Sequence, residues 1–109
     1  MKYENYYSYQ NKQNNSIIFL NKAFEVIEPY FQNNKDRWID HYSGILIRLG
    51  AAYKQKNDYE NAIYYIKNLL EVIEPYRGIQ KFEIIYNDAI SIFNELKNLI
   101  NLGGENKEK

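Results

Sequence analysis

The segment NAIYYIKNLLEVIEPY, residues 61–76, decides the fold, because an earlier stretch of the chain repeats it. NSIIFLNKAFEVIEPY, residues 15–30, aligns with it at an offset of 46 residues, and eight of the sixteen positions are identical. Most other positions change like for like, as Phe19 aligned with Tyr65 does. A register kept over four helical turns indicates an internal repeat, which predicts an array of similar structural units.

Apolar residues of the second copy recur at three- and four-residue steps, the pattern of an amphipathic helix. Asn57 or Asp58 is expected to cap its start, because short polar side chains accept bonds from first-turn amides. Pro75 is expected to end it, and Pro29 to end the helix of the first copy, because the residue before a proline avoids helical geometry.

Two more helices follow from the same kind of periodicity. A long one is expected from about 36 to 56, with Asp36 as a possible cap. A last helix is expected from about 79 to 102, ending at Gly103 and Gly104, with a disordered tail over 103–109. Strand signals are weak, so the fold class is predicted to be all-α.

Composition excludes several classes of protein. The 109 residues carry a formal net charge of zero and no basic stripe, which argues against a nucleic-acid partner. No run approaches eighteen apolar residues, so no membrane span is expected. The absence of cysteine favours a cytoplasmic location, and no secretory leader is visible at the start of the chain.

The stretch LIRLGAAYKQKNDYENAIYYIKNLLEVIEP, residues 46–75, resembles a tetratricopeptide repeat. Leu46 and Leu49 stand at the family's large apolar positions of the first helix, and Gly50 and Ala62 at its small positions. Asn57 takes the place of the usual turn glycine. The 46-residue period exceeds the usual 34, which is similar to the lengthened repeats of Gram-positive peptide-sensing regulators.

The resemblance implies stacked antiparallel helical hairpins, an α-solenoid fragment in one domain over 1–102. The first repeat would span about 3–30, the second about 36–76, and a capping helix about 79–102. About three repeats normally make a stable array. Either the last helix therefore seals the core, or an open end pairs with another chain. The tyrosine-rich N-terminus is the expected edge for a homodimer or another partner.

The family's concave face carries its ligands, so the resemblance implies non-catalytic binding of a peptide or protein segment and suggests a regulatory role. Positions matching that face, with a shift of 47 residues for the last helix, are Tyr9, Ile47, Ala51, Lys54, Gln55, Asn94, Asn98 and Asn101. Asn side chains carry both donors and acceptors, which suits an extended peptide backbone. The alternative function is structural: a protein that self-associates through exposed helix edges.

No pattern argues for an enzyme, a metal or a cofactor. His41 is the one histidine, and without cysteine or a second histidine it cannot build a usual zinc site. Glu25, Glu28, Glu71 and Glu74 come as repeat copies, which favours a shared structural role over acid–base catalysis. Tyr42, Tyr53 and Tyr65 lie on core-facing registers and are expected to pack there.

Overall fold

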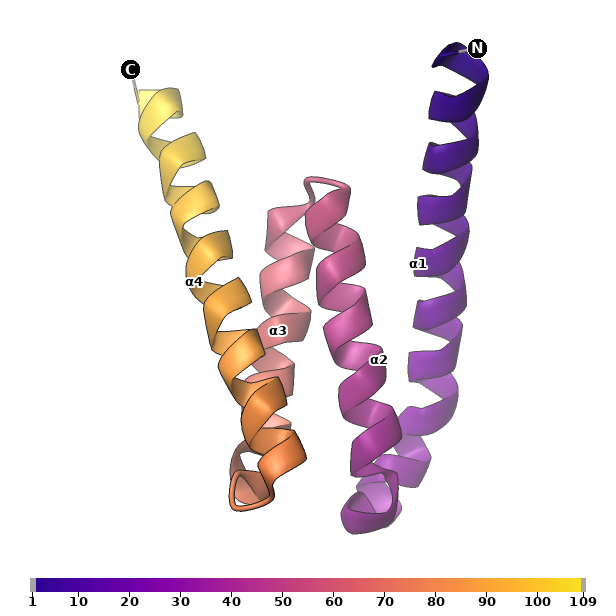
Figure 1. Ribbon diagram of the computed structural model, residues 1–109, viewed down its shortest axis with the longest axis vertical. Coiled ribbons are helices and arrows are strands. Elements are labelled where there is room, and N and C mark those ends of the chain that lie inside the picture. The colour runs from indigo at the N-terminus through magenta and orange to yellow at the C-terminus, as the bar shows by residue number, and fades with distance from the viewer. Residues whose placement is uncertain (1, 109) are drawn as a thin grey trace.

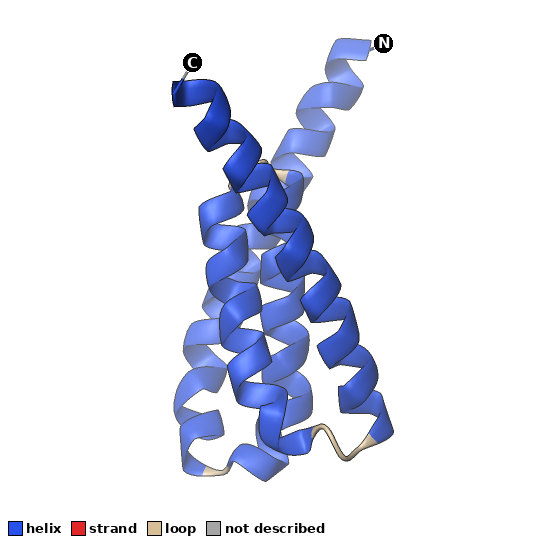
Figure 2. Ribbon diagram, turned by 90° about the vertical axis from the view of Figure 1, so that its left-hand side faces the viewer, coloured by secondary structure: helices blue, strands red, loops and turns tan. Residues whose placement is uncertain are grey.

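The computed structural model describes the backbone of residues 2–108 and the side chains of residues 14–102. Within that range every regular element is helical (Figure 2). The order is α1 (Lys2–Asn33), α2 (Lys35–Gln55), α3 (Tyr59–Ile73), the 3₁₀ turn η1 (Glu74–Tyr76) and α4 (Gln80–Glu108). Each α-helix packs antiparallel against the next one in sequence (Figure 1), which confirms the predicted all-α class.

Contacts between helices that are not neighbours in sequence place the four helices in two layers. Tyr65 of α3 donates a hydrogen bond to Asn21 of α1 (3.1 Å), and its ring meets Phe24 edge-on at 5.9 Å. Two ion pairs join α2 and α4, which are also not neighbours in sequence: Lys54 pairs with Glu95, and Lys81 pairs with Asp40. Thus α1 and α3 form one layer, and α2 and α4 form the other.

The turn between α2 and α3 depends on two polar residues. Asn57 has a φ of 65°, in the left-handed region that glycine adopts freely and asparagine tolerates. Asp58 is the cap of α3: its carboxylate accepts bonds from the backbone N–H of Asn61 (3.4 Å) and from the side-chain amide of Asn61 (2.7 Å). Of the two expected cap candidates, Asp58 therefore caps the helix and Asn57 reverses the chain.

Gly50 lets α2 and α3 approach closely. A Cβ placed on Gly50 would overlap Ile66 Cδ1, lie 2.6 Å from Ile66 Cγ1, and lie 3.6 Å from the carbonyl oxygen of Ala62. Ala62 and Ile66 are both fully buried. The expected small-residue contact between the two helices is therefore present, and the absence of a side chain at residue 50 sets their separation.

The core runs through all four helices. Its members without solvent exposure come from α2, α3 and α4: Leu46, Leu49, Ala62, Ile66, Leu69, Ile73, Ala89 and Leu96. From α1, Ile27 and Phe31 join this core. The three tyrosines expected to pack there do so: Tyr42 is buried, and the rings of Tyr53 and Tyr65 stack at 5.6 Å.

Pro29 does not end the first helix as the sequence predicted, because α1 continues through it to Asn33. The extra turn buries Phe31, which is 2% exposed and stacks on Tyr42 with ring centroids 4.0 Å apart. Burying a phenylalanine contributes about 1.5–3 kcal/mol, close to the roughly 3 kcal/mol that an interior proline costs. In the second copy, Arg77 stands at the position that corresponds to Phe31. There the chain leaves the helix after Ile73 through η1.

Three other helix boundaries also differ from the sequence prediction. The first repeat, over about 3–30, was expected to be an antiparallel pair of helices, but α1 is one continuous helix. Asn34 caps α2 by accepting a hydrogen bond from the N–H of Arg37, and the expected cap Asp36 lies in the first turn. The backbone of α4 stays helical past Gly103 to Glu108. The predicted disorder over 103–109 concerns residues whose side chains lie outside the described range.

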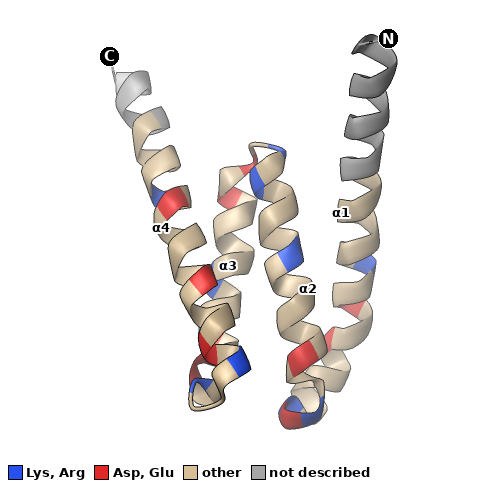
Figure 3. Ribbon diagram, viewed as in Figure 1, with Lys and Arg blue, Asp and Glu red and all other residues tan. Residues whose placement is uncertain are grey.

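Charged residues of both signs are interspersed on the helices (Figure 3), with many near the turns that join α1 to α2 and α3 to α4. Arg77 binds Glu83 through two hydrogen bonds (2.9 and 3.1 Å), and this lowers the pKa of Glu83. Within the described residues, no helix combines the length and the apolar character that a membrane crossing needs.

The Gly50 contact predicts opposite effects for two alanine substitutions in the same helix. A Cβ on Gly44 would meet only Arg48 Nη1, at an ordinary 3.5 Å, so Gly44→Ala should stabilise the protein by about 0.5–1 kcal/mol through helix propensity. Gly50→Ala gains the same propensity but overpacks the core, which costs about 1–3 kcal/mol. Urea unfolding should therefore rank Gly44→Ala above Gly50→Ala, and equal gains would contradict the close contact.

Tyr42 predicts a loss of stability at alkaline pH. Its hydroxyl donates to Glu28 Oε2 at 2.7 Å, and burial together with this bond raises its pKa well above the usual value near 10. Above pH 10 the unfolded chain releases this proton while the folded chain keeps it, so the free energy of unfolding falls as pH rises. Tyr42→Phe keeps the ring stack but loses the bond, so it should be about 0.5–1.5 kcal/mol less stable at pH 7.

The difference in the free energy of unfolding between the wild type and Tyr42→Phe, here called the gap, should then narrow above pH 10, because the wild type loses the contribution of Tyr42 there. Tyr76, whose pKa a hydrogen bond to Asp36 raises to about 12, affects both proteins alike. Urea titrations at several pH values between 7 and 11.5 measure the gap. A gap that stays constant over this range would show that Tyr42 does not titrate differently in the folded chain.

Candidate functional site

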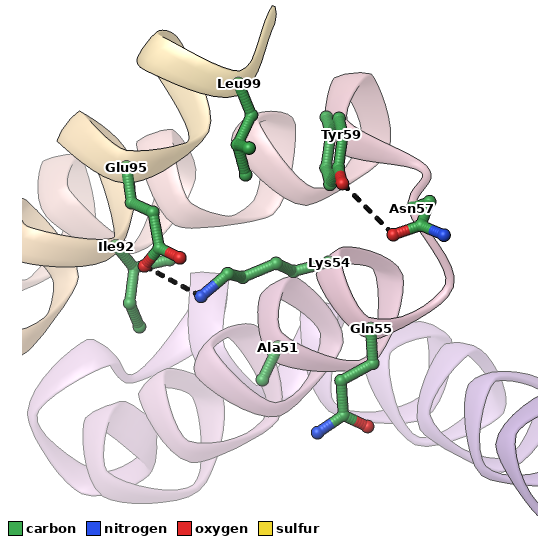
Figure 4. A pocket seen from close by; sticks show the side chains of 8 residues that line it. All are labelled: Ala51, Lys54, Gln55, Asn57, Tyr59, Ile92, Glu95 and Leu99. Atoms are coloured by element: carbon green, nitrogen blue, oxygen red, sulfur yellow. Dashed lines mark hydrogen bonds and ion pairs between the residues drawn. The ribbon is translucent and has the colours of Figure 1, made fainter.

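A groove runs between α2 and α4, with the start of α3 at one end, and we call it the central groove (Figure 4). Its volume is about 430 Å³. Its lining comes from α2, from α4 and from the α2–α3 turn with the start of α3: Ala51, Lys54 and Gln55; Ile92, Glu95 and Leu99; Asn57 and Tyr59. The lining mixes aliphatic side chains with charged and amide groups.

An ion pair crosses the central groove. Lys54 Nζ lies 2.8 Å from Glu95 Oε2, and the two side chains are 30% and 54% exposed. Figure 4 shows them reaching toward each other from α2 and α4. Ion pairs this exposed contribute about 0–1 kcal/mol. The pair therefore closes the groove only weakly, and a ligand with its own charges or amide groups can replace it.

The turn between α2 and α3 forms one end of the central groove. Tyr59 donates a hydrogen bond to Asn57 Oδ1 at 3.0 Å, which ties the first residue of α3 to the residue that reverses the chain. The left-handed backbone at Asn57 brings both side chains to the groove, as Figure 4 shows. A rigid polar end of this kind suits hydrogen bonding to a ligand's main chain.

The structure brings together three of the residues expected at the binding face, since Ala51, Lys54 and Gln55 all line the central groove. Ile47 is instead half-buried and packs against the core. The side chain of Tyr9 lies outside the described residues.

The expected row of asparagines does not line the central groove. Asn94, Asn98 and Asn101 are exposed, but α4 presents Ile92, Glu95 and Leu99 to the groove instead. The reason is geometric, because a groove between two adjacent helices is lined by opposite sides of those helices. A 47-residue shift carries a position to the same side of the other helix, so it cannot find both walls of one groove.

The same shift explains a second surface that the sequence analysis missed. Moving back 47 residues from Ile92 and Glu95 gives Ile45 and Arg48 of α2, and these line cavities between α2 and α1. We call this surface the edge groove. Two adjoining cavities of about 790 and 480 Å³ make up most of it. Its lining includes Ser16, Phe19, Leu20, Ala23, Val26, Ile27 and Tyr30 of α1, and Trp38, Ile45 and Arg48 of α2.

The edge groove is apolar and open to solvent. Phe19, Val26 and Tyr30 are 71%, 66% and 57% exposed. Contiguous apolar surface of this kind marks interaction sites more often than singly scattered residues do. The sequence held the signal, because Phe19, Ala23, Val26 and Tyr30 follow one another at steps of four, three and four.

The remaining polar candidates have structural partners or lie on the surface. His41 is exposed, and its ring meets Trp38 edge-on at 5.7 Å. Glu28 accepts the hydrogen bond of Tyr42, and Glu74 lies 3.8 Å from Arg77. Among the described residues, no group of three or more histidine, aspartate or glutamate side chains is placed to hold a metal ion.

The fold and these two grooves define an all-α domain of four helices with open surfaces on both sides of α2. Comparison of the chain with protein-family profiles, with curated protein sequences and with solved structures found no match.

The weakness of the ion pair across the central groove is testable. In a double-mutant cycle of Lys54→Met and Glu95→Gln, we expect a coupling free energy below about 0.5–1 kcal/mol that shrinks in 0.5 M salt. Urea unfolding of the wild type and the three variants measures it. A salt-insensitive coupling above about 1.5 kcal/mol would mean that the pair holds α2 and α4 together and is not available to a ligand.

Proposed function

We propose that this protein is a non-catalytic module that binds a peptide or protein segment in the central groove. The observation that supports it is the groove itself: two adjacent helices of one layer, α2 and α4, leave a channel lined by three residues expected from the sequence, Ala51, Lys54 and Gln55. The mixed lining offers aliphatic surface for side chains and polar groups for a ligand backbone, as small binding sites usually do.

We also infer that the helices form stacked hairpins similar to tetratricopeptide repeats, as a short α-solenoid closed by α4. Two features support this inference. Gly50 and Ala62 meet at the place where the repeat needs small residues, and Asn57 has the left-handed backbone of the repeat's turn glycine. In such an array the layer that contains α2 and α4 is the ligand-binding one, which agrees with the position of the central groove.

The ligand that best fits the central groove is an extended segment. The charges of Lys54 and Glu95 lie 2.8 Å apart, so the groove offers both signs and no net charge preference. Main-chain amides and carbonyls can bond to both groups, whereas a ligand of one strong charge would be repelled by one of them. A peptide of low net charge with small or aliphatic side chains facing Ala51, Ile92 and Leu99 is therefore expected.

A second candidate function, self-assembly through helix edges, is favoured by one observation. The exposed apolar residues of α1, Phe19, Val26 and Tyr30, form a continuous surface. Analytical ultracentrifugation over a wide concentration range separates the two functions. A module that binds a separate ligand stays monomeric, and an assembly protein gains mass with concentration.

Selection of peptides from a random display library tests the central groove. Ala51→Gln keeps good helix propensity and fills the groove with a longer side chain. Lys67→Gln, at an exposed position of α3 that lines neither groove, is the matched control. Peptides selected on the wild type should bind Lys67→Gln equally and Ala51→Gln at least tenfold more weakly, about 1.4 kcal/mol. Equal binding to all three proteins would rule out the central groove as the site.

A further inference from the structure

The edge groove lies where the internal repeat lacks a helix. In the second copy, Ala62, Ile66, Leu69 and Ile73 form one face of α3 that is fully buried, and Ala62 and Ile66 meet Gly50 of α2. The same positions in the first copy, 46 residues earlier, are Ser16, Leu20, Ala23 and Ile27. All four line the edge groove. Ile27 is buried in the core, but Ser16 is exposed and Leu20 and Ala23 are only half-buried, so most of the face that α2 covers on α3 is left open on α1.

This equivalence sets the kind of occupant. On α3 the face is covered by an antiparallel amphipathic helix that places a residue without a side chain against Ala62 and Ile66. Leu20 takes the place of Ile66 in the edge groove and Ser16 the place of Ala62. A helix with a glycine or alanine facing Ser16 and Leu20, and large apolar residues on either side, would cover the open face in the same way.

The charges around the edge groove differ from those around the corresponding face of α3, which α2 covers. In the second copy, Lys54 of the covering helix pairs with Glu95 at 2.8 Å. The position that corresponds to Glu95 at a shift of 47 residues is Arg48, and within residues 14–102 Arg48 makes no ion pair. Lys22 also lines the groove and is likewise without an acidic partner in that range. A covering helix should therefore carry a carboxylate where α2 carries Lys54.

The α4 helix of a second copy does not meet these requirements, although it is the helix that corresponds to α2. At the same shift, Lys97 stands at the position of Gly50, where the close approach leaves no room for a side chain. Asn101 stands at the position of Lys54, so α4 offers no carboxylate to Arg48. Head-to-tail growth of the array through α4 is disfavoured by both residues.

From these observations we propose that the edge groove binds an amphipathic helix of a partner protein. The partner helix runs antiparallel to α1, has a small residue facing Ser16 and Leu20, and has an acidic residue facing Arg48. Its apolar face covers Phe19, Ala23 and Val26. This is a second site, separate from the central groove, and it takes a helix instead of an extended segment.

Helix α2, which covers the corresponding face of α3, supplies the peptide probe. Two fluorescently labelled, C-terminally amidated peptides of residues 34–58 are compared, one with the natural sequence and one with Lys54→Glu. By fluorescence anisotropy the wild-type protein should bind the Lys54→Glu peptide at least fivefold more tightly. The protein variant Arg48→Glu should reverse this preference toward the natural peptide, because the charges on the two sides are then exchanged.

Two matched variants locate the site. Val26→Lys, at a position 66% exposed on α1, should weaken peptide binding at least tenfold, whereas Tyr64→Lys, 58% exposed on α3, should leave it unchanged. Ala51→Gln should also leave it unchanged, which separates this site from the central groove. Circular dichroism confirms that each variant is folded.

Three results would overturn the proposal. The first is absence of binding by either peptide at millimolar concentration. The second is a peptide preference that Arg48→Glu does not reverse, or binding that Val26→Lys does not weaken. The third is a dimer in ultracentrifugation that Val26→Lys dissociates, because the groove would then belong to a second copy of the chain.

Discussion

The close approach of α2 to α3 at Gly50 is the constraint on which the rest of the structure depends. Because a Cβ there would overlap Ile66, the spacing of the central hairpin requires a residue without a side chain in the middle of a helix. Glycine costs about 1 kcal/mol in a helix interior, so only a packing gain of at least that size keeps it there. With the hairpin fixed, α1 packs against α2 and α4 against α3, and each groove lies beside α2.

The two copies of the repeat show how one sequence pattern acts in two environments. Val26 and Val72 are identical and equivalent, yet Val26 is 66% exposed and Val72 is partly buried. Phe19 is 71% exposed, while its counterpart Tyr65 stacks against Tyr53. The difference lies in the neighbours, because α3 packs against both α2 and α4, whereas α1 packs mainly against α2. Apolar residues kept on the open side indicate a surface that gains from being covered.

Elements that depend on local chemistry could be predicted from the sequence. Periodicity and capping residues predict the bounds of α2 and α3 and the turn at Asn57 and Asp58. Residue size predicts the close approach of the two helices at Gly50. Pro29 was misread because the residue that outweighs it, Phe31, acts through a stack on Tyr42 in another helix. No property of residues 25–30 alone separates this proline from Pro75.

The candidate site was predicted in part for a related reason. The family resemblance pointed to one side of α2, and the three residues that it gave there, Ala51, Lys54 and Gln55, line the central groove. It could not show which side of α4 faces α2, because that depends on the position of α4 beyond α3. Asn94, Asn98 and Asn101 therefore lie outside the central groove, and Ile92, Glu95 and Leu99 form its wall on α4.

The two grooves lie along the same helix, one between α2 and α1 and the other between α2 and α4, and they share no lining side chain. Arg48 and Ile45 line one, and Ala51 and Lys54 line the other. Their chemistry differs as well, since an ion pair crosses the central groove and the edge groove has a cation without an acidic partner in the described residues. Because Gly50 and Leu46 hold α2 against α3 with no space to shift, a ligand in one groove has little means of moving the wall of the other. Two ligands of different kinds, an extended segment and a helix, could therefore occupy this small domain together without competing.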